Sequence, residues 1–188
     1  MRNLTDHIVE GDSANHQVKI TVLEEDLMLV PFNERFVPFV RDGSKQHTIR
    51  ARRADGVTIS AGDRLDMYGN TRQASMYLIA RHVCTRVQAI ELRWEMVPNR
   101  QQWALVIAID GVFLSEDEAI SLAWRDGFRA TGPEEAPMPN PLEQMGDFWI
   151  VQNDFVPGNP PFQGNLIHWD HSKRLPDELP KEKRGKRA

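Results

Sequence analysis

Three side chains that can do chemistry together lie within one short stretch, Gly43-Ser44-Lys45-Gln46-His47-Thr48-Ile49-Arg50. Thr48 and Arg50 are two positions apart in a segment typical of a strand, so their side chains point to the same face of a sheet. Lys45, in the loop just before, can fold back over that face. The spacing predicts a hydroxyl group flanked by two cations, which can hold an anion or activate a nucleophile.

The charge of Arg50 and partial burial both favour the neutral amine of Lys45, so Lys45 can act as a base toward Thr48 or toward water. The same cations can instead hold a phosphate without breaking a bond. A purely structural interpretation is also open, in which Arg50 pairs with Asp63 or Asp126 at the end of a strand.

The elements that must position these residues follow from hydrophobic periodicity and from capping residues. We expect strands at Leu27–Pro31, from Thr48, at Met76–Val97, at Trp103–Asp110 in the centre of the sheet, and at Phe162–Trp169. We expect helices at Glu34–Arg41, capped by Asn33, at Glu116–Arg125, capped by Ser115, and at Leu142–Phe155. Four prolines exclude a regular element from Thr131 to Pro141.

In this order the sequence resembles the ASCH family, whose mark is G-x-K-x-x-T-x-R after a helix that leads out of the first core strand. The similarity continues with Gly62-Asp63 before a strand, Asp126-Gly127-Phe128 after the second long helix and the closing Trp169. The resemblance implies an α+β fold, a PUA-like small β-barrel with helices at its ends. It spans residues 27–170, which leaves an N-terminal extension at 1–26 and a basic, disordered tail at 171–188.

The family includes RNA-binding regulators, a bacterial amidohydrolase that removes the acetyl group from 4-acetylcytidine, and single-strand ribonucleases. The nearest likeness is to the amidohydrolase. It implies Thr48 as nucleophile, Lys45 as its activating base, Arg50 as anion stabiliser, and Asp126 as acid or base where the amidohydrolases have Glu. The resemblance therefore points to RNA or a modified nucleoside as partner. A non-catalytic RNA- or nucleotide-binding module and a single-strand ribonuclease remain alternatives.

Aromatic side chains near the motif have two interpretations. Tyr68, Trp124 and Phe128 can stack on an unpaired base, as aromatic residues do in RNA recognition. They can equally belong to the core. Arg50, Tyr68 and Phe128 are the predicted substrate-binding residues.

The bulk composition limits the remaining classes. A chain of 188 residues, 40% of them hydrophobic, suits one domain. Cys84 is its only cysteine, which excludes an internal disulfide or a thiolate-rich zinc site, and we expect no metal and no cofactor. His168 and His171, three apart on a predicted strand, face opposite ways. The longest apolar stretches are too short to cross a membrane, so we expect a cytoplasmic protein.

Net charge is −4, but it is unevenly distributed. From 171 to 188, Lys and Arg outnumber Asp and Glu seven to three. A basic C-terminal arm can contact nucleic acid, although such a run is more often a solubilising end.

Overall fold

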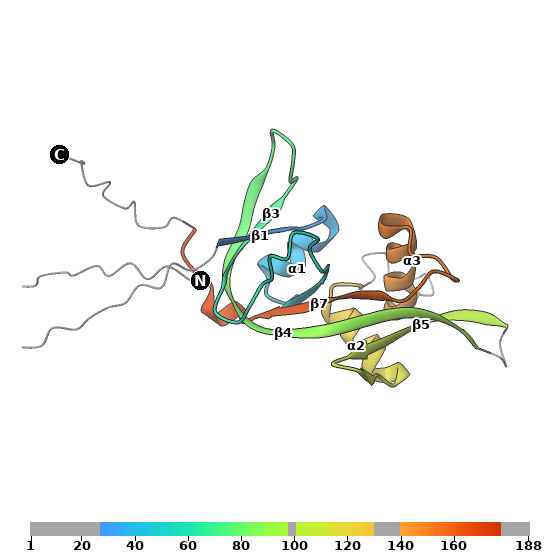
Figure 1. Cartoon of the computed structure of the whole chain (residues 1–188). Coiled ribbons are helices and arrows are strands. Elements are labelled where there is room, and N and C mark those ends of the chain that lie inside the picture. The colour runs from blue at the N-terminus through green and yellow to red at the C-terminus, as the bar shows by residue number, and fades with distance from the viewer. Residues whose placement is uncertain (1–26, 98–100, 130–139, 178–188) are drawn as a thin grey trace, which may run out of the picture.

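The computed structural model describes residues 27–97, 101–129 and 140–177 (Figure 1). Its described strands are β1 (Leu27–Pro31), β2 (His47–Ala51), β3 (Arg64–Gly69), β4 (Tyr77–Val97), β5 (Gln102–Ile109), β6 (Val112–Phe113) and β7 (Phe162–Trp169). The α-helices are α1 (Val37–Arg41), α2 (Glu116–Arg125) and α3 (Pro141–Asn153), and 3₁₀ turns η1 (Glu34–Phe36) and η2 (His171–Lys173) complete the set. The expected α+β class is confirmed.

The long strand β4 organises the whole sheet, because different parts of it pair with different partners. Residues 77–83 run antiparallel to β3, residues 84–92 pair with β7, and residues 90–97 pair with β5. β1 adds to β3 in parallel, and β2 adds to β7. Figure 1 shows β4 turning between these two parts, with the β3–β4 hairpin standing away from β5 and β7.

The expected closed barrel is not what the structure shows. In the described part of the chain, β1 pairs with β3 alone and β2 with β7 alone, so the seven-stranded sheet stays open between β1 and β2. The Arg50 side chain, rather than a backbone ladder, reaches across from β2 and donates to the carbonyl of Pro31 in β1. Closure requires pairing of these two strands along their length, which is absent here.

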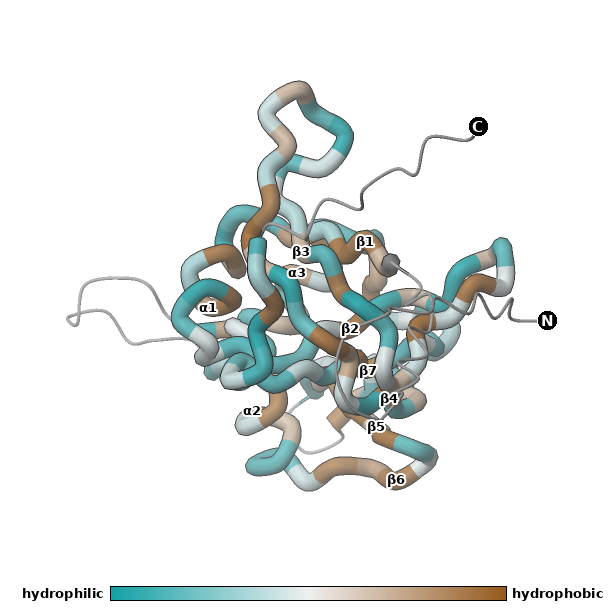
Figure 2. Tube along the Cα trace, turned by 90° about the vertical axis from the view of Figure 1, so that its left-hand side faces the viewer, coloured by the Kyte–Doolittle hydropathy of each residue, from teal (hydrophilic) through white to brown (hydrophobic). Residues whose placement is uncertain are grey.

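The core lies between the sheet and the helices. Side chains with at most 1% exposure come from every layer, and they include Val40, Leu65, Met67, Leu92, Ile107 and Met145. α2 and α3 pack against each other. Outside the core, β6 exposes Val112 and Phe113, and Figure 2 shows this apolar segment at one extremity of the molecule and the polar tip of the β3–β4 hairpin at another.

The first residues of the predicted tail contact the sheet. The Leu175 amide donates to the carbonyl of Arg81 in β4 at 2.9 Å, and the Arg81 guanidinium donates to the carbonyl of Asp177. Residues 178–188, with most of the basic arm, lie outside the described residues, as do the extension at 1–26 and the proline-rich segment at 130–139. The predicted domain division therefore stays a prediction.

Candidate functional site

Two distant segments supply the site, and each is held by local hydrogen bonds. The loop after α1 turns at Gly43, whose φ is +77°, and the Lys45 amide donates to the carbonyl of Phe39 at 2.8 Å. On the other side, α2 starts with the capping box of Ser115 and Glu118 and ends with Asp126 as its C-cap. Lys45 and Asp126 thereby face each other although 81 residues separate them.

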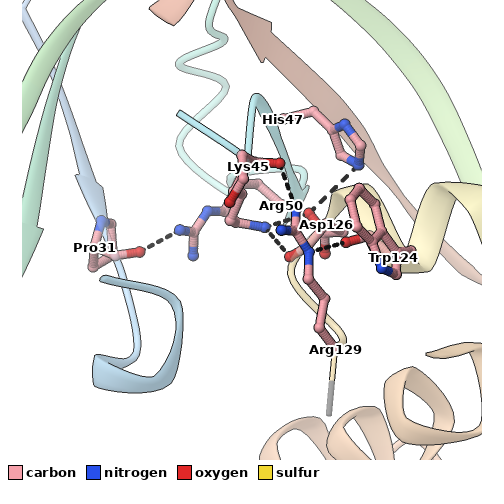
Figure 3. Close-up of polar contacts among 8 residues, drawn as sticks. Pro31, Lys45, His47, Arg50, Trp124, Asp126 and Arg129 are labelled. Carbon is pink, nitrogen blue, oxygen red and sulfur yellow. Dashed lines mark hydrogen bonds and ion pairs between the residues drawn. The ribbon is translucent and has the colours of Figure 1, made fainter. Parts of the chain in front are cut away.

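Lys45 is completely enclosed by this arrangement. It is 1% exposed, and its Nζ donates to the backbone carbonyl of Asp126 at 2.5 Å and also to the Oδ1 of the same residue. The ammonium group lies 4.8 Å from the centre of the Phe36 ring and 5.9 Å from that of Phe32. Figure 3 shows Lys45 directed at Asp126. A lysine held by one carboxylate and two aromatic rings has a fixed position.

Burial dominates the electrostatics of the pair. It lowers the pKa of Lys45 to about 8, against the opposing effect of Asp126, while Arg50 and Arg129 lower it further by smaller amounts. Burial likewise raises the pKa of Asp126, although Lys45 opposes that change. The sequence led us to expect the Arg50 charge as the first cause and burial as the second, and their order is the reverse. Lys45 can therefore release its proton near neutral pH.

Arg50 lies on the side of the Lys45–Asp126 pair that faces the gap between β1 and β2. Its guanidinium stacks 5.1 Å from the centre of the Phe32 ring and donates to the carbonyl of Pro31. Burial lowers its pKa to about 10, and the Asp126 charge opposes this. The alternative partner Asp63 accepts a hydrogen bond from the Ser60 amide instead, at 2.7 Å. Arg50 thus keeps a cationic group between Asp126 and the gap in the sheet.

Thr48 is buried in β2, and in the described part of the chain it takes no part in this network. It is 6% exposed and lies opposite Ile167 of β7. Among the described residues, no hydrogen bond connects its hydroxyl with Lys45 or Asp126. The proposed nucleophile and its base would have to approach each other for the reaction.

His47 belongs to the site although the sequence did not single it out. Its Nε2 lies 3.7 Å from the Oδ1 of Asp126, and no described group gives this buried atom a hydrogen bond. Burial, followed by the charge of Lys45, lowers its pKa to about 2, so the imidazole is neutral. The sequence signal for His47 was its position inside the motif, two residues after Lys45. Alternation along the strand, however, places the His47 side chain on the face opposite to Thr48 and Arg50.

A second clamp holds the loop of Lys45 onto the end of α2. Arg129 donates from Nη2 to the carbonyl of Ser44 at 2.6 Å and from Nε to that of Trp124 at 3.0 Å. Its guanidinium also lies 3.7 Å from the centre of the Trp124 ring (Figure 3). Trp124 is half exposed, and Arg129 already covers one face of its indole.

The other two predicted aromatic residues have different surroundings. Phe128 is 1% exposed and packs edge-on against Phe36 and Phe148, with ring centres 5.3 and 5.4 Å away. Tyr68 lies in β3 and is partly exposed. Its hydroxyl forms no hydrogen bond with the described residues. Substrate binding by these two residues stays a prediction.

Other features of the described residues add no further chemistry. Within them, no group of three or more His, Cys, Asp and Glu side chains is arranged to hold a metal ion. Cys84 is buried, and burial raises the pKa of its thiol to about 11. No helix of the described ranges is long and apolar enough to cross a membrane.

No family model, no curated protein and no solved structure matches the chain. The chemistry of the site is therefore inferred from its own functional groups. A lysine with a lowered pKa, a carboxylate, an arginine and a hydroxyl are suited to holding a polar or anionic ligand, and to proton transfer at it.

Proposed function

We propose that this chain is an ASCH-type, PUA-like domain that recognises RNA or a modified nucleoside at Lys45, Asp126 and Arg50. The observation that carries the proposal is the contact between Lys45 and Asp126. These residues come from the two most specific landmarks of the resemblance, the G-x-K-x-x-T-x-R motif and the Asp126-Gly127-Phe128 turn. If the sequence matched the pattern by chance, residues of the two landmarks would not be expected to meet in one buried ion pair.

The charges of the site support a polar or anionic ligand. Arg50 cannot lose its charge near neutral pH, and its guanidinium lies at the open side of the sheet. A ribonucleotide offers phosphate, ribose hydroxyl and base-edge acceptors, all of which an arginine can bind. We therefore favour recognition of RNA or a nucleoside over a role for the cluster in stability alone.

Hydrolysis of the acetyl amide of 4-acetylcytidine is the second candidate, favoured by the lowered pKa of Lys45. The Thr48 Oγ would attack the amide carbonyl while Lys45 takes its proton, and the departing N4 amine would receive a proton from Lys45 or Asp126. Water would then hydrolyse the acetyl ester to acetate. For the first step Lys45 must exchange a hydrogen bond to Asp126 for one to Thr48. Asp126 is also one methylene shorter than the Glu of the amidohydrolases.

The test is incubation of the purified chain with 4-acetylcytidine and, separately, with a short single-stranded RNA, with products followed by mass spectrometry and binding by fluorescence anisotropy. Thr48→Val keeps the side-chain shape and removes the hydroxyl. Lys45→Met combined with Asp126→Asn removes both charges and leaves neither one unpaired. Binding of RNA or nucleoside that the double variant loses supports recognition.

The same experiment distinguishes the amidohydrolase from the ribonuclease. Acetate release that disappears in Thr48→Val supports the amidohydrolase, whereas RNA cleavage that persists in Thr48→Val and disappears in the double variant supports a ribonuclease that uses the 2′-hydroxyl of the RNA. If the unaltered chain neither binds nor converts either compound, the proposal is wrong.

A further inference from the structure

A cavity of about 200 Å³ lies between β1 and β2, where the sheet is open. Its walls are apolar: Val30 and Met28 come from β1, and Val57 and Ile59 come from the segment after β2. This volume is below the roughly 300–1,000 Å³ of pockets that hold drug-sized ligands. The cavity therefore has room for one small group.

The polar side chains that line the cavity are Arg50, Asn165 and Arg53, and Arg53 is exposed and paired with Asp55. Arg50 of β2 and Asn165 of β7 are directly paired across the two strands, so their side chains emerge next to each other on one face. The Nε of Arg50 is buried and has no hydrogen-bond partner. Among the described residues, nothing forms a hydrogen bond with the Asn165 carboxamide. Two adjacent polar residues with unused hydrogen-bonding capacity thus belong to the lining of a largely apolar cavity.

The types of these groups limit what can fill the cavity. A guanidinium only donates hydrogen bonds, whereas a carboxamide donates from one end and accepts at the other. The matching ligand is flat, has apolar faces, and carries along one edge an acceptor followed by a donor and an acceptor. Pyrimidine bases have such an edge, in which the O2 carbonyl is followed by N3 and by the group on C4. Cytosine and uracil differ in the order of donor and acceptor, and the carboxamide fits either one by turning over.

We propose that the cavity between β1 and β2 binds a pyrimidine base, with Arg50 donating to O2 and the Asn165 carboxamide bonding to N3 and the C4 substituent. This subsite rests on the proposed recognition of RNA or a nucleoside, and it specifies which bases are recognised. Arg50 belongs to both places, because its charge acts on Asp126 and its side chain lines the cavity. Arg50 is thus the residue that connects the cavity with the ion pair.

The test is a titration of the isotope-labelled full chain with cytidine, uridine, adenosine and ribose, followed by NMR through the side-chain amide signals of asparagine. Two variants remove the subsite. Asn165→Leu deletes the edge contacts without stranding a partner, and Val57→Trp, at an exposed position, fills the cavity. Asn153→Leu makes the same chemical change at the exposed end of α3 and is the matched control.

We expect the Asn165 amide signals to move with cytidine and uridine, weakly with adenosine, and not with ribose. Affinity for the pyrimidine nucleosides should fall about tenfold or more in Asn165→Leu and in Val57→Trp, and stay unchanged in Asn153→Leu. Equal affinity for adenosine, or unchanged binding in both cavity variants, overturns the subsite. If the Lys45→Met/Asp126→Asn variant loses nucleoside binding while both cavity variants retain it, the proposed function stands and the subsite is wrong. Absence of all nucleoside binding by the unaltered chain overturns the subsite, and retained RNA binding would then leave the broader proposal intact.

Discussion

The buried ion pair of Lys45 and Asp126 suits a functional site, but its burial lowers the stability of the folded protein. Burial shifts the pKa of each partner toward the neutral form, so their attraction does not fully compensate for the loss of water. The pair is nevertheless well satisfied, because the lysine also donates to a backbone carbonyl. Such a pair is expected where a proton or a ligand has to be handled, rather than where stability alone is needed.

Removal of one charge should destabilise the protein strongly. We expect Lys45→Met to lower the free energy of unfolding by about 3–5 kcal/mol, because it leaves the Asp126 carboxylate buried without a counter-charge. Lys45→Met together with Asp126→Asn should recover most of that loss. Urea denaturation at pH 7 measures both. Equal destabilisation in the single and double variants would mean that the pairing of charges is not what matters.

Neutral buried histidines make the fold sensitive to acid. Burial lowers the pKa of His47 to about 2 and that of His82 to about 4, both below the ordinary value of 6.5. The unfolded chain then binds protons that the folded chain does not, so stability should fall as the pH drops below about 6.5, by up to about 1.4 kcal/mol per pH unit for each histidine. Protonation of Asp126, whose pKa is raised, offsets part of this loss.

Urea denaturation at pH 7, 6 and 5 tests this dependence. His82→Phe, at a fully buried position next to Trp169, should flatten the pH profile without removing it. A stability that is constant from pH 7 to 5 contradicts the assignment of neutral histidines.

Sequence alone could single out the residues of the motif as candidates, but it could not predict the contacts that they make. Thr48 and Arg50 follow from alternation, and Lys45 from its place in the preceding loop. The contact of Lys45 with Asp126 depends on how α2 packs against the loop, which local patterns do not encode. His47 was missed for a related reason, since a carboxylate arriving from another element determines which strand residues form the site.

At the scale of elements, the ends of the helices determine where the site forms. The glycine after the C-cap of α2, Gly127, has a φ of +95° and turns the chain so that Asp126 faces Lys45. The turn before Lys45 is equally constrained, because a Cβ on Gly43 would lie 2.5 Å from the Cγ of His171. Both glycines are therefore required by geometry and not merely tolerated.

Loss of the cap of α2 should weaken the helix that carries Asp126. Ser115 accepts from the Glu118 amide, and the Glu118 carboxylate accepts from the Ser115 amide at 2.8 Å. We expect Ser115→Ala to cost about 1 kcal/mol of unfolding free energy. Ser121→Ala, at an exposed position within the same helix, is the control and should have little effect. Thermal denaturation followed by circular dichroism measures both, and equal effects would argue against the cap.

Most elements were predictable because their signals are local. The bounds of α2 and β7 are as expected, and β4 differs from its prediction by one residue. The segment Glu34–Arg41 was expected as one helix, and it is a 3₁₀ turn followed by α1. Pro38 explains the break, since it lacks an N–H and restricts the residue before it. β5 was expected at the centre, yet only the two-residue β6 covers its far side.

At the scale of the whole molecule, the described part of the chain forms an open sheet, and two of its edge strands, β1 and β2, line the same cavity. Alternation within β1 and β2 identified both strands, but it could not reveal whether they pair with each other. That depends on the path of the chain through β3 and β4, far away in the sequence. The closed barrel, expected from the order of the elements and from the resemblance, is therefore corrected by the structure.

Protection against hydrogen exchange should follow this arrangement. β7 has neighbours on both sides, β2 and β4, whereas within the described residues β1 pairs with β3 alone. After correction for intrinsic rates, we expect the amides of β7 to exchange at least about tenfold more slowly than those of β1. Exchange followed by mass spectrometry on peptides of the full chain measures the difference. Similar protection of both strands would indicate that β1 has a second neighbour in solution.

Because β4 runs through both parts of the sheet, it limits where residues can be inserted into the sequence or deleted from it. A single residue inserted or deleted within residues 86–97, where the pairings with β7 and β5 run without a register shift, would turn every later side chain of the strand to the opposite face, and both pairings would slip. Residues 70–75, at the tip of the β3–β4 hairpin, lie outside that constraint. Descendants of this sequence should therefore tolerate insertions and deletions at the hairpin tip and retain a strand of constant length beyond it.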